Sequence, residues 1–277
     1  MSRRLAFLGP RGTFSEEAAL RYDPDGQLVP FVSISAVAAA IGSGMADEGV
    51  VPIENSLEGP VTETLDILIH SSELSVRSEI VLPVEHLLLA RAGAEASDIK
   101  IIASMPQALA QCRQFIEQRF PKATLEAALS TAAAVEEMMG RDNAAAIGNQ
   151  RAAELYGAEV LAQGIQDRTT NLTRFVILAD EDHPPTGDDK TSLAFAFAVE
   201  DRPGLLVAAL EEFSSRDINL SKIESRPSKE RLGVYIFLAD LDGHRTEQPL
   251  AESLERVREK SSFFRVLGSY PRYREQR

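Results

Sequence analysis

Short apolar runs alternate with helical segments along the first two thirds of the chain. Arg4–Leu8, Gln27–Phe31 and Glu48–Pro52 have the apolar character of strands, and the Ala-rich stretch Ser33–Ile41 is typical of a helix. Further strands and helices are predicted in alternation at Ile99–Ala103, 106–119, Thr124–Ala128, Ala132–Met139, Ala144–Ile147 and Asn149–Tyr156. This order indicates an α/β architecture. Because a long extended segment, Val76–Ala90, separates two such blocks, we expect two lobes around a cleft.

The pattern changes after residue 180. Asp180–Lys190 is acidic, contains Pro184 and Pro185, and indicates a linker. Strands are then expected at Thr191–Val199, Leu220–Ser225, Gly233–Leu241 and Phe264–Tyr270, with helices at Leu205–Arg216 and Pro249–Lys260. The order βαββαβ is that of a ferredoxin-like unit, which has the size of a sensor or dimerisation module. We therefore expect a first domain, a linker and a second domain at residues 1–180, 181–190 and 191–277.

The charge of the chain excludes some partners and constrains others. A net charge of −13 over 277 residues argues against binding to nucleic acid or to an anionic membrane. No apolar run approaches the ~20 residues of a membrane span, and no signal peptide is expected at the N-terminus. An anionic ligand gains nothing from the field of the whole protein, so local donors must hold it.

Cysteine and histidine usage gives no sign of a metal or redox site. The chain has one cysteine, Cys112, which cannot form an internal disulfide, so we expect a reducing, cytoplasmic compartment. Its helical surroundings favour a packed thiol over a nucleophile. The histidines at positions 70, 86, 183 and 244 are scattered without the spacing of metal ligands. We therefore expect no metal and a chemistry without a cofactor.

Two loops that follow predicted strands carry candidate ligand donors. Gly9–Glu16 joins a strand to a helix through a Gly-rich turn, with Ser15 as the expected N-cap, and free N–H groups at such a turn can bind an anion. The second loop holds Asn55 and Ser56, which can each donate to an oxyanion at the carboxyl end of a sheet. A plain tight turn and an Asx-turn are the alternatives.

The stretch Asn171–Phe175, Asn-Leu-Thr-Arg-Phe, places an amide, a hydroxyl and a guanidinium at the start of an apolar strand. Such a strand edge is suited to presenting hydrogen bonds to a ligand. Successive strand residues face opposite sides, so Thr173 and Arg174 are not expected to face the cleft together. One of the two is expected to face it, while the alternative is that both residues only cap the strand.

Taken in order, these motifs resemble those of prephenate dehydratases. The matching segments are Gly9-Pro10-x-Gly12-Thr13-Phe14-Ser15-x-x-Ala18, Val51-Pro52-Ile53-Glu54-Asn55-Ser56 and Thr173-Arg174-Phe175. In the C-terminal part, Gly204-Leu205-Leu206-Val207 and Ile223-Glu224-Ser225-Arg226-Pro227 resemble the phenylalanine-binding motifs of an ACT domain. The resemblance spans nearly the whole chain.

The resemblance implies a two-lobed catalytic domain similar to type 2 periplasmic binding proteins, an ACT regulatory domain, and a homodimer or homotetramer. It implies that prephenate loses carbon dioxide and water to give phenylpyruvate, in phenylalanine biosynthesis, under control by phenylalanine. It also implies that Thr173 is the catalytic residue. A threonine hydroxyl is too weak an acid to give up its proton outright, so its expected role is orientation, charge stabilisation or a proton relay.

The other expected site residues fall into two groups. Substrate binding is expected of Thr13, Asn55, Ser56, Ser104 and Arg174. Effector binding is expected of Gly204, Leu205, Leu206, Val207, Asn219, Glu224, Ser225, Arg226 and Pro227.

The chain departs from the family pattern at two positions. The milder one is Leu205, where the family's Gly-Ala-Leu-Val has alanine. Met105 stands in Ser104-Met105-Pro106 where the family usually has histidine, and methionine cannot donate or carry a proton. Two alternative functions stay open. One is arogenate dehydratase, for which Glu54 or Glu58 would accept the substrate amine, and the other is a non-catalytic amino-acid sensor.

Overall fold

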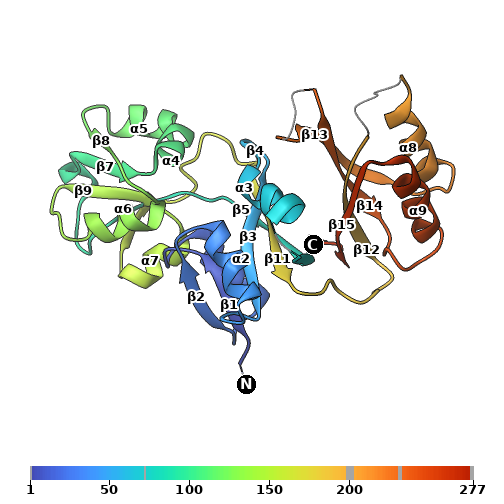
Figure 1. The fold of residues 1–277 in the computed structure, drawn as a ribbon. Coiled ribbons are helices and arrows are strands. Elements are labelled where there is room, and N and C mark those ends of the chain that lie inside the picture. Colours follow the sequence, from blue (N-terminus) through green and yellow to red (C-terminus); the bar gives the residue numbers. More distant parts are fainter. Residues whose placement is uncertain (1, 72, 198–202, 230–232, 275–277) are drawn as a thin grey trace. The chain divides into compact units, whose positions relative to one another are not determined.

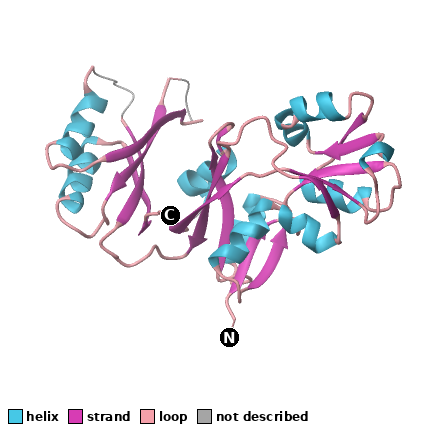
Figure 2. Ribbon diagram, turned by 180° about the vertical axis from the view of Figure 1, so that it is seen from behind, coloured by secondary structure: helices cyan, strands magenta, loops and turns pink. Residues whose placement is uncertain are grey.

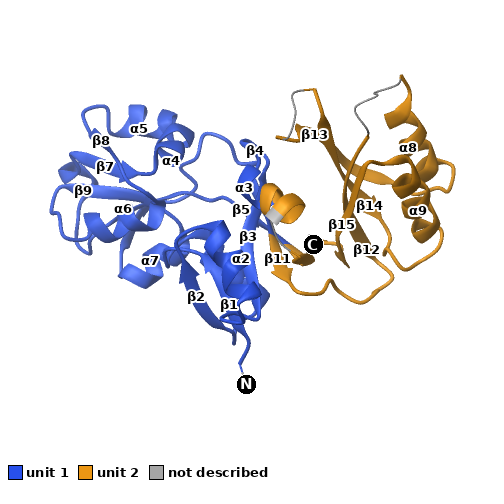
Figure 3. Ribbon diagram, viewed as in Figure 1, with its two compact units in different colours: residues 1–64, 80–175 blue, residues 65–79, 176–277 orange. Residues whose placement is uncertain are grey.

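The computed structural model describes residues 2–71, 73–197, 203–229 and 233–274 (Figure 1). The chain folds into two compact units, Met1–Thr64 with Ile80–Phe175 and Leu65–Glu79 with Val176–Arg277 (Figure 3). It leaves the first unit after residue 64, returns at residue 80, and leaves again after residue 175.

One lobe of the first unit is built on a six-stranded sheet. Its strands are β1 (Arg4–Leu8), β2 (Gln27–Phe31), β3 (Glu48–Asn55), β4 (Gly59–Pro60), β5 (Ser75–Pro83) and β11 (Leu172–Ala179). Their order is β2-β1-β3-β11-β5, with β4 paired to the end of β3. Strand β1 is parallel to both β2 and β3, joined through α1 (Phe14–Tyr22) and α2 (Ile34–Gly42).

Glycine brings α2 close to this sheet. A Cβ on Gly49 in β3 would lie 2.6 Å from Cγ1 of Val37 and 2.9 Å from Cδ1 of Ile41. Both of these α2 side chains are buried. The absence of a side chain at Gly49 therefore lets the helix pack directly on the strand that leads to Asn55.

The second lobe is built on a five-stranded sheet of order β10-β6-β9-β7-β8. Its elements are β6 (Leu87–Ala90), η2 (Ala96–Asp98), β7 (Ile101–Ser104), α4 (Pro106–Gln111), α5 (Arg113–Arg119), β8 (Thr124–Ala127), α6 (Thr131–Met138), β9 (Ala144–Gly148), α7 (Gln150–Tyr156) and β10 (Glu159–Ala162). Buried side chains form two clusters, one around Leu88, Ile102 and Ile147 and the other around Leu89 and Val135.

Two segments cross between the lobes and bond to each other. One comprises residues 84–86, between β5 and β6, and the other leads into β11. The N–H of Val84 donates to the carbonyl of Asn171 (2.8 Å), and the N–H of Ile165 donates to the carbonyl of His86 (3.1 Å). The cross-over segments, far apart in sequence, are therefore held side by side.

The expected α/β architecture is confirmed, with local differences. The N-cap of α1 is Thr13 rather than Ser15, because the Thr13 side chain accepts from the N–H of Glu16. The helix expected at 106–119 is interrupted at Cys112, where φ −113° and ψ 18° separate α4 from α5. The extended segment 76–90 forms two strands, β5 and β6.

The second unit contains the expected ferredoxin-like order. Its elements are β12 (Asp189–Ala196), α8 (Leu205–Ser214), β13 (Leu220–Pro227), β14 (Tyr235–Asp242), α9 (Leu250–Lys260) and β15 (Phe263–Pro271). The antiparallel sheet has the order β13-β14-β12-β15, with α8 and α9 on one face (Figure 2). Residues 198–199, expected to end the first strand, lie outside the described residues. The unit also includes the end of α3 (Thr62–Asp66) and the π-helical turn η1 (Ile67–Ser71).

Among the helices of the described residues, none has the length and apolar character needed to cross a membrane.

We predict that Gly268→Ala destabilises the second unit by about 2–3 kcal/mol. A Cβ at Gly268, whose φ is +149°, would lie 2.2 Å from the carbonyl oxygen of Val76, a backbone atom that cannot turn aside. Urea unfolding measures the effect. Gly42→Ala is the matched control, because nothing lies within 4 Å of the added Cβ there. Equal unfolding midpoints for the two variants would contradict the prediction.

Candidate active site

The first unit holds a cavity of about 410 Å³ between its two sheets. Its walls come from the turn before α1, the ends of β3 and β11, the cross-over at His86, the start of α4 and the start of α6. The volume lies within the range of small-molecule sites, roughly 300–1,000 Å³. Ligand sites in α/β folds lie outside the carboxyl ends of their strands, where β1 and β3 end here.

The alternation of β11 decides which of its side chains reach the cavity. Asn171, Thr173 and Phe175 line it, whereas Arg174 does not. Arg174 instead forms an ion pair with Glu54 at 3.3 Å, and its side chain is only 13% exposed. Thr173 therefore faces the cavity as expected, and Arg174 lies on the other side of the strand.

The side chain of Asn55 determines how the Thr173 hydroxyl is bonded. Oδ1 of Asn55 accepts from the N–H groups of Leu57 and Glu58, both at 3.0 Å. Because backbone N–H groups can only donate, these two bonds fix which end of the amide carries the oxygen. Nδ2 of Asn55 must then donate to Oγ1 of Thr173 (2.9 Å) and to Oδ1 of Asn171 (2.7 Å).

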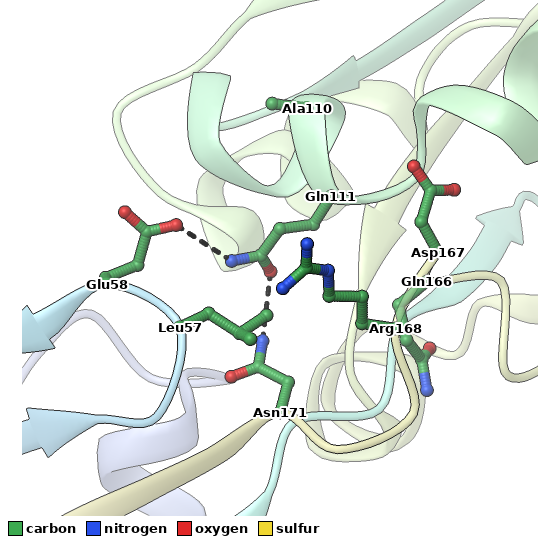
Figure 4. Close-up of a pocket in the computed structure, with 8 residues that line it drawn as sticks. All are labelled: Leu57, Glu58, Ala110, Gln111, Gln166, Asp167, Arg168 and Asn171. Carbon is green, nitrogen blue, oxygen red and sulfur yellow. Dashed lines mark hydrogen bonds between the residues drawn. The ribbon is translucent and has the colours of Figure 1, made fainter.

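The same direction continues beyond Asn171. Nδ2 of Asn171 donates to Oε1 of Gln111 at 3.2 Å, and Nε2 of Gln111 donates to a carboxylate oxygen of Glu58 at 3.3 Å (Figure 4). The side-chain amides of Asn55, Asn171 and Gln111 thus form an amide chain of hydrogen bonds. It starts at the N–H groups of Leu57 and Glu58 and ends at the Glu58 carboxylate. Since every amide has a fixed direction, Thr173 accepts a bond and keeps its own proton available.

A smaller cavity of about 320 Å³ adjoins this amide chain and is shown in Figure 4. Gln111 and Asn171 line both cavities. Of the residues that line the smaller one, only Arg168 is cationic, and its side chain points toward Gln111 (Figure 4). The Gln111–Asn171 hydrogen bond therefore lies between the larger and the smaller cavity.

The larger cavity is neutral, but the N-termini of two helices give it a positive potential. None of its lining residues, all within the described part of the chain, is a lysine or an arginine. The N-termini of α1 and α6 open into it, capped by Thr13 and Ser130, which accept from the N–H groups of Glu16 and Ala133. The first N–H groups of a helix have no partner within the helix, and the helix dipole favours anions there.

Two other residues expected at the site do not reach the cavity, because backbone groups engage their hydroxyls. Oγ of Ser56 donates to the carbonyl of Thr170 (3.0 Å) and accepts from the N–H of Leu172 (2.9 Å). Ser104 is fully buried and donates to the carbonyl of Ile147 (2.8 Å). Ser56 ties the turn after β3 to the start of β11, and Ser104 ties β7 to β9.

The sequence reasoning did not single out Gln107, Gln111 or His86, whose polar side chains line the cavity. Gln107 and Gln111 lie four residues apart, on one face of a helix, and both line the cavity, so their spacing was an available signal. His86 follows Glu85 directly before the apolar run Leu87–Ala90. A polar side chain at the entry to a buried strand was the corresponding signal.

No group of three or more acidic, histidine or cysteine side chains within the described residues could hold a metal ion. Cys112 is fully buried beneath α4, and burial, with a smaller contribution from Asp167, raises the pKa of its thiol to about 12. The thiol is therefore placed as a packed residue and not as a nucleophile.

In the second unit, the residues expected to bind an effector lie on two elements. Gly204 is the N-cap of α8 with φ +94°, a conformation that suits glycine, and Leu205 and Leu206 pack against the core of the unit. Val207 is 58% exposed. Asn219 donates to a carboxylate oxygen of Asp242 at 3.2 Å just before β13.

Strand β13 lies at the edge of its sheet and carries the remaining expected residues. Glu224 pairs with Lys222 at 3.5 Å, whereas Ser225 and Pro227 are exposed. Arg226 is buried and donates to a carboxylate oxygen of Asp66, the last residue of α3. An edge strand has backbone groups that a second chain can pair with.

The family model for prephenate dehydratase matches residues 5–183. The chain belongs to the prephenate dehydratase family. The model for the ACT domain matches residues 195–259, so this prephenate dehydratase homologue also carries the expected C-terminal domain. The predicted fold class and the prediction of a lyase of this family are confirmed.

Known relatives of this prephenate dehydratase homologue cover almost its whole length. A bifunctional chorismate mutase/prephenate dehydratase of Aquifex aeolicus is 41% identical over 97% of this chain and 74% of its own. The crystal structure of a prephenate dehydratase from Arthrobacter aurescens in complex with L-Phe has a TM-score of 0.88 and 38% identity, covering 97% of this chain and 90% of its own. GqqA, described as a quorum-quenching acylase, has a TM-score of 0.88 and 30% identity, covering 98% of each chain.

We predict that Cys112 in the folded protein reacts with a thiol-specific disulfide reagent at pH 8 at least about 100-fold more slowly than in the unfolded chain. Burial excludes the reagent, and the raised pKa leaves almost no thiolate. Because the chain has one cysteine, the unfolded protein provides the control by releasing one equivalent. Rapid release from the folded protein would show that the thiol is accessible.

Proposed function

We propose that this chain converts prephenate into phenylpyruvate, carbon dioxide and water, without a cofactor, in phenylalanine biosynthesis in the cytoplasm. Residues 1–180 would form the catalytic domain, 181–190 the linker and 191–277 the ACT regulatory domain. The observation that carries the proposal is the bond from Nδ2 of Asn55 to Oγ1 of Thr173. It occupies a lone pair of the hydroxyl and leaves the hydroxyl proton free for a ligand.

A free hydroxyl proton suits the loss of water from prephenate. Hydroxide is a poor leaving group, so the departing ring oxygen needs a donor as its bond to carbon breaks. Thr173 donates a hydrogen bond to that oxygen and keeps its own proton, and the bond from Asn55 orients its hydroxyl. The electron pair of the breaking bond to the departing carboxylate enters the ring, and the hydroxide that leaves takes a proton from solvent. The formation of an aromatic ring supplies the driving force.

The other end of the substrate carries two carboxylates. The N-termini of α1 and α6 face the cavity, and their free N–H groups suit a carboxylate where no lysine or arginine is present. Thr13 remains a proposed binding residue because it caps α1 and lines the cavity. The carboxylate that leaves as carbon dioxide is destabilised if it lies against the apolar side chains of Phe14 and Val84, in poorer contact with water.

Met105 also fits this arrangement. It lines the cavity at the N-cap position of α4, where it makes no side-chain cap bond. The proton of the Thr173 hydroxyl does not pass through residue 105 in this proposal. A thioether at residue 105 adds apolar surface to the cavity, and the reaction does not require a histidine there.

The similarity to GqqA makes acyl hydrolysis a second candidate. A hydroxyl nucleophile needs a base that accepts its proton. Thr173 instead has a donor, Nδ2 of Asn55, as its neighbour. This arrangement favours the dehydratase over an acyl transfer that begins at Thr173.

The arogenate alternative finds less support. Glu54 is paired with Arg174, and Glu58 already accepts from Gln111. An amine of the substrate would have to compete for these carboxylates. Rates of the purified full-length chain with prephenate, arogenate and an N-acyl amide separate the three reactions, and activity on the acyl amide alone would overturn the proposal.

We predict that Thr173→Val lowers kcat about 100-fold or more, with KM changed less than about threefold, because the variant keeps the shape of the residue but not its donor. Thr173→Ser is the matched control and keeps a large part of kcat. The rate of phenylpyruvate formation measures both. A folded valine variant with the kcat of the parent would remove Thr173 from the mechanism.

We also propose that phenylalanine binds to the ACT domain and controls the activity. The bound L-Phe of the Arthrobacter aurescens homologue supports this, as do the exposed edge strand β13 and the glycine at the start of α8. Pairing of two β13 edges would give a homodimer, or a homotetramer through further contacts.

A route for the control starts at Arg226. Its bond to Asp66 ties β13 to the end of α3, and α3 follows the β3–β4 hairpin that carries Asn55 and Glu58. A ligand that binds one arrangement of Arg226 more tightly than another can therefore shift the position of the hairpin.

We predict that L-phenylalanine gives saturable heat in a calorimetric titration of the full-length chain and changes the rate of prephenate turnover over the same concentration range. D-phenylalanine is the control, because a site that holds both the ammonium and carboxylate groups distinguishes the two enantiomers. Absence of heat with the L form would end the proposal of an effector site.

A further inference from the structure

We infer that His86 is a positioning residue, which as a neutral Nε2–H imidazole fixes the side-chain amide of Gln111 and, through it, the bonds of Asn171, Asn55 and Thr173. This inference deepens the proposed function and rests on it. His86 does not touch the reacting oxygen, so its contribution would be to the orientation of the groups that do.

The ring of His86 has little freedom to move. His86 is 3% exposed and lies on the cross-over between β5 and β6. Its N–H donates to Oε1 of Gln166 (3.0 Å), and its carbonyl accepts from the N–H of Ile165 (3.1 Å). Its ring packs edge-on against Phe14 with 6.1 Å between ring centroids. The backbone and the ring are therefore both held in place.

The neighbours of Gln111 determine the protonation of the ring. Nε2 of Gln111 donates to Glu58, so Oε1 of Gln111 is the atom that faces Asn171 and His86. Nε2 of His86 lies 3.0 Å from this oxygen. An amide oxygen only accepts, and Nε2 of His86 must therefore carry a hydrogen.

The second ring nitrogen favours the neutral form. Nδ1 of His86 is buried and has no hydrogen-bond partner within the described residues. A proton on it would be an unpaired, buried donor, which is unfavourable. Burial likewise lowers the pKa of His86, opposed by the bond to Gln111. The imidazole thus stays neutral with its hydrogen on Nε2.

Loss of this hydrogen bond would free the end of the amide chain. Without His86, the Glu58 carboxylate and Nδ2 of Asn171 still set the direction of the Gln111 amide, but Oε1 of Gln111 loses one of its two donors and can shift away from Asn171. Asn171 would then be held less firmly against Asn55, and Asn55 would hold Thr173 less firmly. The expected effect is on kcat, because orientation of the hydroxyl matters most in the transition state.

Two substitutions test the inference, because they differ in where they place an amide NH2. The Gln side chain reaches the position of Nε2, whereas the shorter Asn side chain reaches only that of Nδ1. We expect His86→Gln to keep kcat within about threefold and His86→Asn to lower it about 10- to 30-fold at nearly constant KM. His70→Asn is the matched control at an exposed histidine. Equal kcat values in the two His86 variants would overturn the inference, once thermal unfolding has shown that both variants are folded.

A double substitution shows whether His86 acts through Gln111. In a Gln111→Leu background, His86→Asn is expected to cause no further decrease in kcat, because the acceptor of its bond is already gone. A full additional 10- to 30-fold loss would mean that His86 acts by another route.

Nitrogen-15 NMR of the histidine rings tests the bond without any assay of activity. At pH 7 we expect the His86 ring to be the neutral tautomer with its hydrogen on Nε2, assigned by its disappearance in His86→Gln. An Nδ1–H tautomer or an imidazolium would overturn the inference. Because this result does not depend on turnover, an inactive chain with the expected tautomer would contradict only the proposed function.

Discussion

Two backbone N–H groups, those of Leu57 and Glu58, determine the direction of the hydrogen bonds around the cavity. Both donate to Oδ1 of Asn55, which leaves its NH2 group for Thr173 and Asn171. An asparagine or glutamine side chain with only side-chain partners could turn over with little change in shape. Here the N–H groups in the turn after β3 fix the direction of the Asn55 amide, and the Glu58 carboxylate fixes that of the Gln111 amide. The hydroxyl of Thr173 thereby accepts a bond from Asn55, which leaves its own proton to be donated.

The electrostatic potential of the larger cavity is determined by the lack of cationic side chains among its lining residues and by the helix N-termini that open into it. The protein is strongly anionic, and no cationic side chain lines the larger cavity within the described residues. A dianionic substrate would then depend on the partial charges at the starts of α1 and α6. Such donors are fixed to the fold and need no reorganisation during the reaction. They also leave the departing carboxylate less stabilised than an arginine would, which is the condition that favours its loss as carbon dioxide.

Local patterns in the sequence predicted most of the strands and helices and the placement of Thr173 and Arg174 on opposite sides of β11, whereas the choice of Thr173 for the cavity rested on the family resemblance. Alternation along a strand separates Thr173 from Arg174 without knowledge of the fold. The hydroxyls of Ser56 and Ser104 could not be assigned in this way, because their partners are backbone groups 114 and 43 residues away in sequence. Gln111 was missed for a similar reason: its bonds join α4 to residues that approach it only after the lobes have formed. The break at Cys112 also depends on tertiary packing, since the local sequence continues the helix.

The cross-over segments hold the residues of the amide chain in place. Val84 bonds to the carbonyl of Asn171, and the backbone of His86 bonds to Gln166 and Ile165, so these bonds link the two segments that connect the lobes. Asn55 comes from the six-stranded sheet, whereas Gln111 comes from the helix that follows β7 in the other lobe. A rotation of one lobe against the other would therefore lengthen the Gln111–Asn171 bond before it disturbed either core. The geometry of the hydroxyl at Thr173 is therefore tied to the separation of the lobes.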